Sequence, residues 1–317
     1  MGTVHDTVPI IRRRIHQRVA ALGPGNWLLA VSGGMDSMVL LDAAAQTLDR
    51  DSLAVATFDH GTGPAATAAA ALVAAHALDL GIGCVCGTAA SAGRTESDWR
   101  AARWAFLNDV AARTRATVVT AHTLDDQIET VFIRALRGAG PRGLAGLFAA
   151  SPVARPLLET TRAEIAQYAA EQGIAFVTDP SNTDRRHLRN RVRLDLLPAL
   201  EAASPGFKAS LLEMARKASS WRAQMEDIAL SFRVMSDSPQ THSFDRRPLR
   251  EFPAESLKCL WPALCARAGI ILDWRGTERL AEFTIVGETG QKIQLSGGVD
   301  VQMGRQAITF RSAAQNA

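Results

Sequence analysis

The sequence predicts an α/β fold, with a doubly wound parallel sheet followed by a smaller, mainly helical C-terminal region that ends in a short β element. Short apolar segments typical of strands alternate with longer helical patterns over residues 1–137. This order is typical of parallel βαβ units. Polar clusters directly follow three of the four apolar segments, and ligands bind beyond these strand ends in such sheets.

The elements of the first half follow one another in regular order. The expected strands are Trp27–Val31, Leu53–Phe58, Ile82–Gly87 and Thr117–Ala121, and the expected helices are Met38–Leu48, Ala65–Leu80, Ser97–Thr114 and Asp125–Arg137. The turn-rich segment Gly138–Gly143 ends the alternation. We expect a catalytic domain at residues 1–205 and an accessory domain at residues 206–317.

The remaining chain reads as helical and then as strand-like. Helices are expected at Thr161–Gly173, at Leu188–Leu200 with a break at Pro198, and from about Phe207 to Phe232. Ser236–His242 is rich in Ser, Asp and Pro, which predicts a linker. Alternating residues in 292–295, 299–303 and 307–310 predict a small β element.

Composition limits the class of protein. With 47% hydrophobic and 21% charged residues, the 317-residue chain is typical of a globular protein. No apolar stretch approaches the roughly 18 residues of a membrane span. The arginine-rich N-terminal region lacks the apolar segment of a secretory signal. We therefore expect a cytoplasmic protein without a membrane partner.

The four cysteines do not suggest a metal site. Cys84, Cys86, Cys259 and Cys265 form no Cys-x-x-Cys pair, and no histidine cluster completes a zinc set. Strand alternation would place Cys84 and Cys86 on one face. Buried free thiols in a reducing compartment are the expected interpretation.

The segment after the first expected strand carries the strongest functional signal. Ser32-Gly33-Gly34-Met35-Asp36-Ser37 joins an apolar strand to a helical pattern. Two glycines permit close approach of a ligand, and the helix N-terminus offers free N–H groups to an anion. Asp36 can cap the helix or hold a divalent cation. An ordinary strand-to-helix turn is the alternative, and a Walker A loop is excluded because no lysine is present.

Two further clusters belong to the same sheet edge. Asp125, Asp126 and Glu129 follow His122 and share helix faces. Beside a phosphate loop, this predicts a magnesium site or a polar hold on the bound ligand, with a helix N-cap as the alternative. His60, in Asp59-His60-Gly61, could position substrate or move a proton, although a lone histidine is more often a packing residue.

A basic cluster lies farther along the chain. Five arginines fall within nine residues and open a helix, where arginine opposes the helix dipole. Guanidinium groups suit the phosphates of RNA or of a nucleotide, and a solvated helix face is the alternative. The five are Arg185, Arg186, Arg189, Arg191 and Arg193.

These motifs together resemble a known family. The loop Ser32–Ser37 resembles the PP-loop of enzymes that split ATP between its α- and β-phosphates. The ordered set over residues 25–200 resembles tRNA(Ile)-lysidine synthetase. Its further members are Asp59-His60-Gly61, Glu96-x-x-x-Arg100-x-x-Arg103-Trp104, His122-x-x-Asp125-Asp126-Gln127-x-Glu129, Arg155-Pro156-Leu157, Asp179-Pro180-Ser181-Asn182 and Arg189-Asn190-x-x-Arg193.

The resemblance implies a two-step reaction with ATP and Mg2+. ATP adenylates the C2 oxygen of the wobble cytidine in the CAU anticodon of tRNA(Ile), and the ε-amine of free L-lysine then displaces AMP. It implies that Ser32–Ser37, His60 and His122 bind the nucleotide, that Asp36, Asp125 and Asp126 bind the metal ion, and that Asp126 and Glu129 handle metal or lysine. Arg189 and Arg193 would hold phosphates or the intermediate. Arg100, Arg103, Arg185, Arg186, Asn190 and Arg191 would contact RNA, and the enzyme could form a homodimer.

The sequence departs from the family pattern at two histidines. Thr57 stands where the family has the first histidine of His-x-Asp-His-Gly, and Thr123 stands where it has the second of His-His. Three alternatives stay open. The chain could be a tRNA-thiolating PP-loop enzyme, which needs a cysteine at the sheet edge, an amide-forming ligase, which needs an ammonia source, or an inactive nucleotide- or RNA-binding protein.

Overall fold

The computed structural model describes residues 10–312 except 62, 90–94 and 239. Contacts divide the chain into two compact units. The first contains Met1–Ile133 and Ala150–Leu212, and the second contains Arg134–Ala149 and Glu213–Ala317. Each unit is considered by itself below. The expected boundary at residue 205 stays a prediction.

A four-stranded parallel sheet forms the centre of the first unit, as the sequence predicts. Its strands are β1 (Trp27–Ala30), β2 (Leu53–Asp59), β3 (Gly83–Thr88) and β4 (Thr117–Val119), in the order β3-β2-β1-β4. Trp27 of β1 is in register with Leu53 on one side and Thr117 on the other. The strand order therefore reverses between β1 and β4, and open α/β sheets bind ligands at this switch point.

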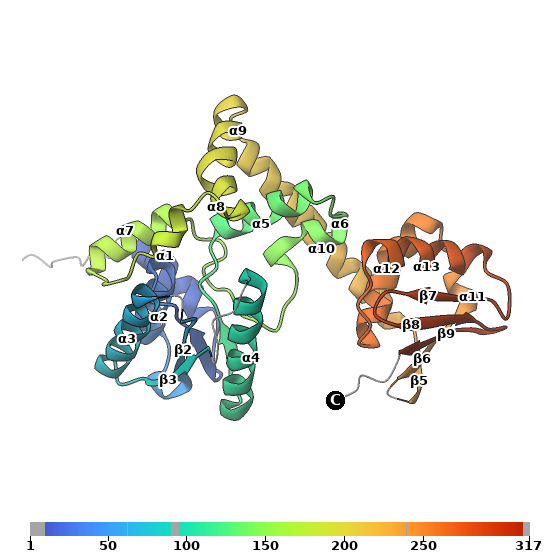
Figure 1. The fold of residues 1–317 in the computed structure, drawn as a ribbon, viewed down its shortest axis with the longest axis horizontal. Coiled ribbons are helices and arrows are strands. Elements are labelled where there is room, and N and C mark those ends of the chain that lie inside the picture. The colour runs from blue at the N-terminus through green and yellow to red at the C-terminus, as the bar shows by residue number, and fades with distance from the viewer. Residues whose placement is uncertain (1–9, 62, 90–94, 239, 313–317) are drawn as a thin grey trace, which may run out of the picture. The chain divides into compact units, whose positions relative to one another are not determined.

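Helices cover both faces of this sheet, so the doubly wound prediction is confirmed (Figure 1). Leu29 and Val31 pack in one core with residues of α1 (Ile10–Ala20), α2 (Met35–Thr47), α3 (Pro64–Asp79) and α7 (Arg162–Gln172). Leu28 and Val118 face the other way and pack against Leu107 of α4 (Glu96–Thr114). Alternation along β1 thus separates two cores, because successive strand side chains point to opposite faces.

The helices that follow carry the acidic and basic clusters. α5 spans Leu124–Leu136, α8 spans Leu188–Arg191, and α9 spans Leu197–Ala203. Between α8 and α9 lies a π-helical turn, Val192–Leu196. The expected break at Pro198 is absent, because Pro198 lies in the first turn of α9, where its missing N–H costs no hydrogen bond.

The second unit combines helices with a five-stranded antiparallel sheet. Its strands are β5 (Val234–Ser238), β6 (Thr241–Asp245), β7 (Lys292–Leu295), β8 (Val299–Met303) and β9 (Ala307–Ser312), in the order β5-β6-β9-β8-β7. The helices are α6 (Pro141–Leu144), α11 (Arg246–Leu249), α12 (Ala254–Arg267), α13 (Trp274–Val286) and the part of α10 (Phe207–Ser231) that begins at Glu213. The rings of Phe244, Trp261 and Phe310 pack against one another in its core.

One expected element is wrong in this unit. The composition of Ser236–His242 predicts a linker, but its two ends lie in the paired strands β5 and β6. Ser236 Oγ and His242 Nδ1 are 2.8 Å apart across this pair. The polar composition reflects an edge strand, whereas Phe244 of β6 is buried in the core. The expected C-terminal β element is confirmed and forms part of this larger sheet.

The cysteine prediction holds only in part. Cys84 and Cys86 lie on β3 with their sulfur atoms 4.0 Å apart, so they share one face as expected. Cys265 is buried, but Cys86 is exposed, because β3 is an edge strand of the parallel sheet. Among the described residues, no helix is long and apolar enough to cross a membrane.

Candidate active site

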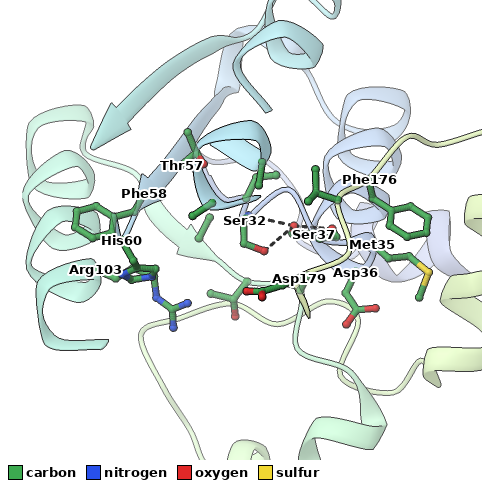
Figure 2. Close-up of a pocket in the computed structure, with 18 of the residues that line it drawn as sticks. Ser32, Met35, Asp36, Ser37, Thr57, Phe58, His60, Arg103, Phe176 and Asp179 are labelled. Atoms are coloured by element: carbon green, nitrogen blue, oxygen red, sulfur yellow. Dashed lines mark hydrogen bonds between the residues drawn. The ribbon is translucent and has the colours of Figure 1, made fainter. Parts of the chain in front are cut away.

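A cavity of about 670 Å3 opens at the carboxyl ends of β1, β2 and β4 in the first unit. Figure 2 shows Phe58, His60 and Arg103 at one end, Met35 and Phe176 at the other, and Ser32 and Ser37 between them. The predicted convergence of three polar clusters is therefore found. Predicted site residues on its wall are Ser32, Gly34, Met35, Asp36, Ser37, His60, Arg100, Arg103, His122, Asp126, Arg189 and Arg193.

The loop after β1 has the geometry of an anion-binding turn. Gly33 has φ +79°, and a Cβ there would lie 2.8 Å from Ala69 Cβ, so only glycine fits. Ser37 Oγ donates to the Gly34 carbonyl at 2.9 Å and accepts from Ser32 N–H at 3.1 Å. Asp36 and Ser37 lie in the first turn of α2, where free N–H groups can meet a phosphate.

Asp36 is the carboxylate of this loop that retains a free oxygen. Its Oδ2 lies 3.7 Å from Arg162 Nε, whereas its buried Oδ1 has no hydrogen-bond partner within the described residues. Burial raises the pKa of Asp36 to about 6, although Arg162 acts in the opposite direction. A buried, unpaired carboxylate oxygen fits a divalent cation, because such ions take oxygen ligands.

The end of β2 supplies an aromatic and basic wall. His60 packs edge-on against Phe58, with ring centroids 5.0 Å apart, and its buried Nδ1 has no hydrogen-bond partner in the described structure. Burial and the nearby Arg103 guanidinium lower the pKa of His60. Both effects favour the neutral form of the His60 ring. Thr57, which replaces a family histidine, is buried on the same wall.

At the end of β4, Asp126 has the helix-cap role that was the alternative interpretation of the acidic cluster. Asp126 Oδ2 accepts hydrogen bonds from Thr123 N–H at 2.9 Å and from Thr123 Oγ at 3.0 Å, which is a helix cap. Burial opposes ionisation of Asp126, but Arg189 and the Thr123 N–H hold its pKa below the ordinary value. Burial lowers the pKa of His122 to about 4, and its Nδ1 lies 2.8 Å from Thr120 Oγ.

Glu129 lies behind this wall and is held by arginines. Its carboxylate is 2% exposed and accepts from Arg189 Nε at 2.6 Å and from Arg193 Nε at 2.6 Å. The π-helical turn begins at Val192, between these two arginines, and such turns are frequent at functional sites. Glu129 is thus placed to orient both guanidinium groups, which line the cavity.

Arg162 is a site residue that the sequence patterns did not identify. Its guanidinium reaches three carboxylates, Asp36 at 3.7 Å and Asp126 and Glu129 at 3.4 Å each. Its backbone N–H donates to Asp125 Oδ2 at 2.7 Å at the start of α7. The only local signal is the capping box of α7, which marks a helix start but not a function.

A segment after α7 completes the wall. Val177 N–H donates to the Gly33 carbonyl at 2.9 Å, which fixes this segment beside the phosphate loop. Asp179 and Asn182 of the Asp-Pro-Ser-Asn motif then line the cavity. Asn190 supports them from outside, because its amide donates to the carbonyls of Ser181 and Asp184 at 2.8 Å.

The other predicted site residues lie away from the cavity wall. The Gly33 carbonyl accepts a hydrogen bond from the backbone N–H of Val177, and the Asp125 carboxylate accepts one from the backbone N–H of Arg162. Arg185 pairs with Asp195 and Arg186 pairs with Asp184 on the surface, and Arg191 is exposed. The described residues contain no group of three or more His, Cys, Asp and Glu side chains arranged to hold a metal ion.

Comparison with known proteins supports one family. Residues 8–200 match the PP-loop domain family. A tRNA(Ile)-lysidine synthase from Novosphingobium aromaticivorans is 40% identical over 235 residues, covering 68% of this chain and 69% of that protein. One from Methylobacterium nodulans is 35% identical over 278 residues, covering 82% of each. The chain belongs to the tRNA(Ile)-lysidine synthase family.

Other comparisons agree with this assignment. A family member from Salinispora arenicola is 35% identical over 243 residues, covering 72% of this chain and 73% of that protein. Among solved structures, the U34-tRNA thiolase NcsA from Methanococcus maripaludis superposes with a TM-score of 0.54 and 16% identity, over 66% of this chain and 79% of that one. This structural likeness shows the fold alone.

Proposed function

We propose that the chain ligates free L-lysine to C2 of the wobble cytidine in the CAU anticodon of tRNA(Ile), with conversion of ATP to AMP and pyrophosphate. One observation carries the proposal. The phosphate loop, His122, Asp126 and the Arg-Asn-x-x-Arg arginines share one cavity, in a chain 35–40% identical to lysidine synthases. The cytidine can enter this cavity at a low free-energy cost, because it lies in a single-stranded loop and has no base pair to break.

In the first step, hydrogen-bond donors and positive charges would face the negatively charged phosphates of ATP. The cytidine C2 oxygen attacks the α-phosphorus, and pyrophosphate leaves. The backbone N–H groups and hydroxyls of Ser32–Ser37 would hold the pyrophosphate, while Arg189 and Arg193 would face the α-phosphate. Asp36 fits a magnesium ion because of its unpaired oxygen, and a bound ion would neutralise charge that develops on the leaving group.

The second step needs a neutral amine and a good leaving group. The lysine ε-amine adds to C2, and AMP departs with the former C2 oxygen. Asp126 is ionised and lines the cavity, so its negative charge can attract the incoming lysine ammonium, whose proton is lost to solvent before the amine adds to C2. Glu129 has both oxygens engaged by arginines, and we therefore assign it as a positioning residue.

Contacts with the RNA, both in the cavity and beside it, complete the proposal. We assign Arg100 and Arg103 to the RNA that enters the cavity, and Arg185, Arg186 and Arg191 to phosphates beside it. The second unit would bind another part of the tRNA. A cytoplasmic location and a homodimer stay predictions, which cell fractionation and light scattering after size-exclusion chromatography would check.

The decisive experiment measures AMP release from ATP with a tRNA(Ile) transcript carrying the CAU anticodon. The expected result is AMP release that depends on lysine, with labelled lysine in the RNA. AMP release without lysine incorporation would indicate a different nucleophile. A lack of ATP consumption under all conditions would favour a binding protein.

Thiolation is the alternative within this fold, and the cysteine positions oppose it. No cysteine lines the described part of the cavity wall. Cys84 and Cys86 lie along β3, where burial and then Cys86 raise the pKa of Cys84 to about 12. Such a thiol is protonated at neutral pH and is a poor nucleophile.

A further inference from the structure

Three arginines contact Glu129, and Arg162 is held differently from the other two, Arg189 and Arg193. Arg189 and Arg193 each place a guanidinium nitrogen 2.6 Å from Glu129. The three carboxylate contacts of Arg162 are longer, at 3.4–3.7 Å. Charge-assisted hydrogen bonds are short when strong. Arg162 is therefore shared among three carboxylates and bound tightly by none.

The backbone of Arg162 is held by a hydrogen bond, whereas its side chain lies near three different carboxylates. Asp125 Oδ2 holds its N–H at 2.7 Å, so the start of α7 stays in place. The side chain lines the cavity and is 27% exposed. If the guanidinium leaves Asp36, Asp126 and Glu129 still lie next to it and can take its charge. The guanidinium can therefore leave Asp36 and still keep two negatively charged neighbours.

Asp36 is the partner in this set that can also take another cation. Its Oδ1 has no hydrogen-bond partner within the described residues, whereas Asp126 and Glu129 have short contacts to other groups. Arg162 and a divalent ion would thus compete for the same carboxylate. An ion on Oδ1 and the guanidinium near Oδ2 would repel each other strongly in a partly buried site, so each weakens the binding of the other.

We propose that Arg162 is a displaceable counter-ion of Asp36, which a divalent metal ion must replace when it binds the phosphate loop. This inference rests on the proposed function, since Asp36 is there the metal ligand. Before substrate binds, Arg162 satisfies the loop carboxylate and keeps the cavity balanced in charge. After the ion binds, Arg162 moves fully to Asp126 and Glu129 and remains a positioning residue for that wall.

The test is direct binding of Mn2+, followed by electron paramagnetic resonance, without ATP, lysine or tRNA. Arg162→Gln is expected to bind Mn2+ about tenfold more tightly than the wild type, since one neighbouring charge shifts the affinity of a carboxylate for a cation by about that factor or more. Arg162→Met keeps the aliphatic stem and repeats the test if Arg162→Gln does not fold. Adding Asp36→Asn to either variant should remove the gain.

The matched control is Arg193→Gln. It also removes one positive charge from the cluster, but Arg193 contacts Glu129 and not Asp36. Competition predicts a clearly larger gain for Arg162→Gln than for Arg193→Gln. Equal gains, or no gain for Arg162→Gln, would overturn the inference. Because the readout needs no turnover, its failure is distinct from failure of the lysine-dependent AMP assay.

Discussion

Arg193 and Glu129 form a two-point ion pair, with Nε 2.6 Å from Oε1 and Nη2 3.1 Å from Oε2. The residues lie 64 positions apart in the sequence, and the Glu129 side chain is 2% exposed. Arg189 and Arg162 donate to the same carboxylate. Glu129 is thus the shared anchor of three guanidinium groups.

Glu129→Gln should destabilise the protein and reduce ligase activity strongly. The variant leaves three partly buried arginines without their common counter-charge, which costs about 3 kcal/mol for a broken buried pair. Urea denaturation followed by circular dichroism measures the change in the free energy of unfolding. Glu171→Gln, at an exposed position of α7, is the control and should leave stability unchanged. Wild-type stability of Glu129→Gln would contradict the anchoring role.

Gly33→Ala should disrupt the phosphate loop more than a glycine substitution elsewhere. The new Cβ would lie 2.8 Å from the Ala69 carbonyl oxygen in addition to forcing alanine to φ +79°. Gly81→Ala is the matched control, because φ is +72° there but no atom lies within 4 Å. The control should lose about 1 kcal/mol from backbone strain alone. Gly33→Ala should lose more and also lose ATP binding, measured by calorimetry.

His122 should make the protein less stable in acid. Its pKa is about 4 when folded and 6.5 when unfolded, so between these values only the unfolded state binds the proton. Stability therefore falls as pH drops from 6.5 to 4, by up to about 3 kcal/mol for this group. Comparing His122→Asn with the wild type at pH 7 and pH 4.5 isolates the effect. The variant should lose less stability on acidification, and an equal loss would refute the prediction.

Cysteine replacement should leave the ligase reaction intact. A Cys84→Ala, Cys86→Ser double variant changes side chains on β3 that do not line the cavity. Its rate of lysine-dependent AMP release should stay within about twofold of the wild type, as for other changes outside a site. Loss of turnover with a normal melting temperature would revive the thiolation alternative.

Arg191→Gln should weaken tRNA binding without changing ATP affinity. Arg191 is exposed next to the arginines of the site. Removing a cation that pairs with one phosphate lowers the slope of log affinity against log salt by about one. Filter binding over a range of salt concentrations measures this slope. Arg113→Gln, on the exposed end of α4, is the control and should retain the wild-type slope.

The sequence predicts the parallel sheet and the convergence of polar clusters at its edge because both depend on local patterns. Apolar runs such as Trp27–Ala30 and the glycine loop behind them have a direct physical signature. Local patterns could not identify Arg162, since its role depends on contacts with Asp36 and Glu129, which are 126 and 33 residues away in the sequence. Local composition also predicted a linker where β5 lies, because a polar edge strand has the composition of a linker.

The hydrogen bond from Val177 to Gly33 has a consequence for folding. It joins backbone positions 144 residues apart, and α7, which lies between them in the sequence, packs against α2. Contacts of such long sequence separation form slowly because a large loop must first close. A chain still emerging from the ribosome would therefore carry an unfinished nucleotide site until residue 177 is available, and ATP would bind late in folding rather than guide its start.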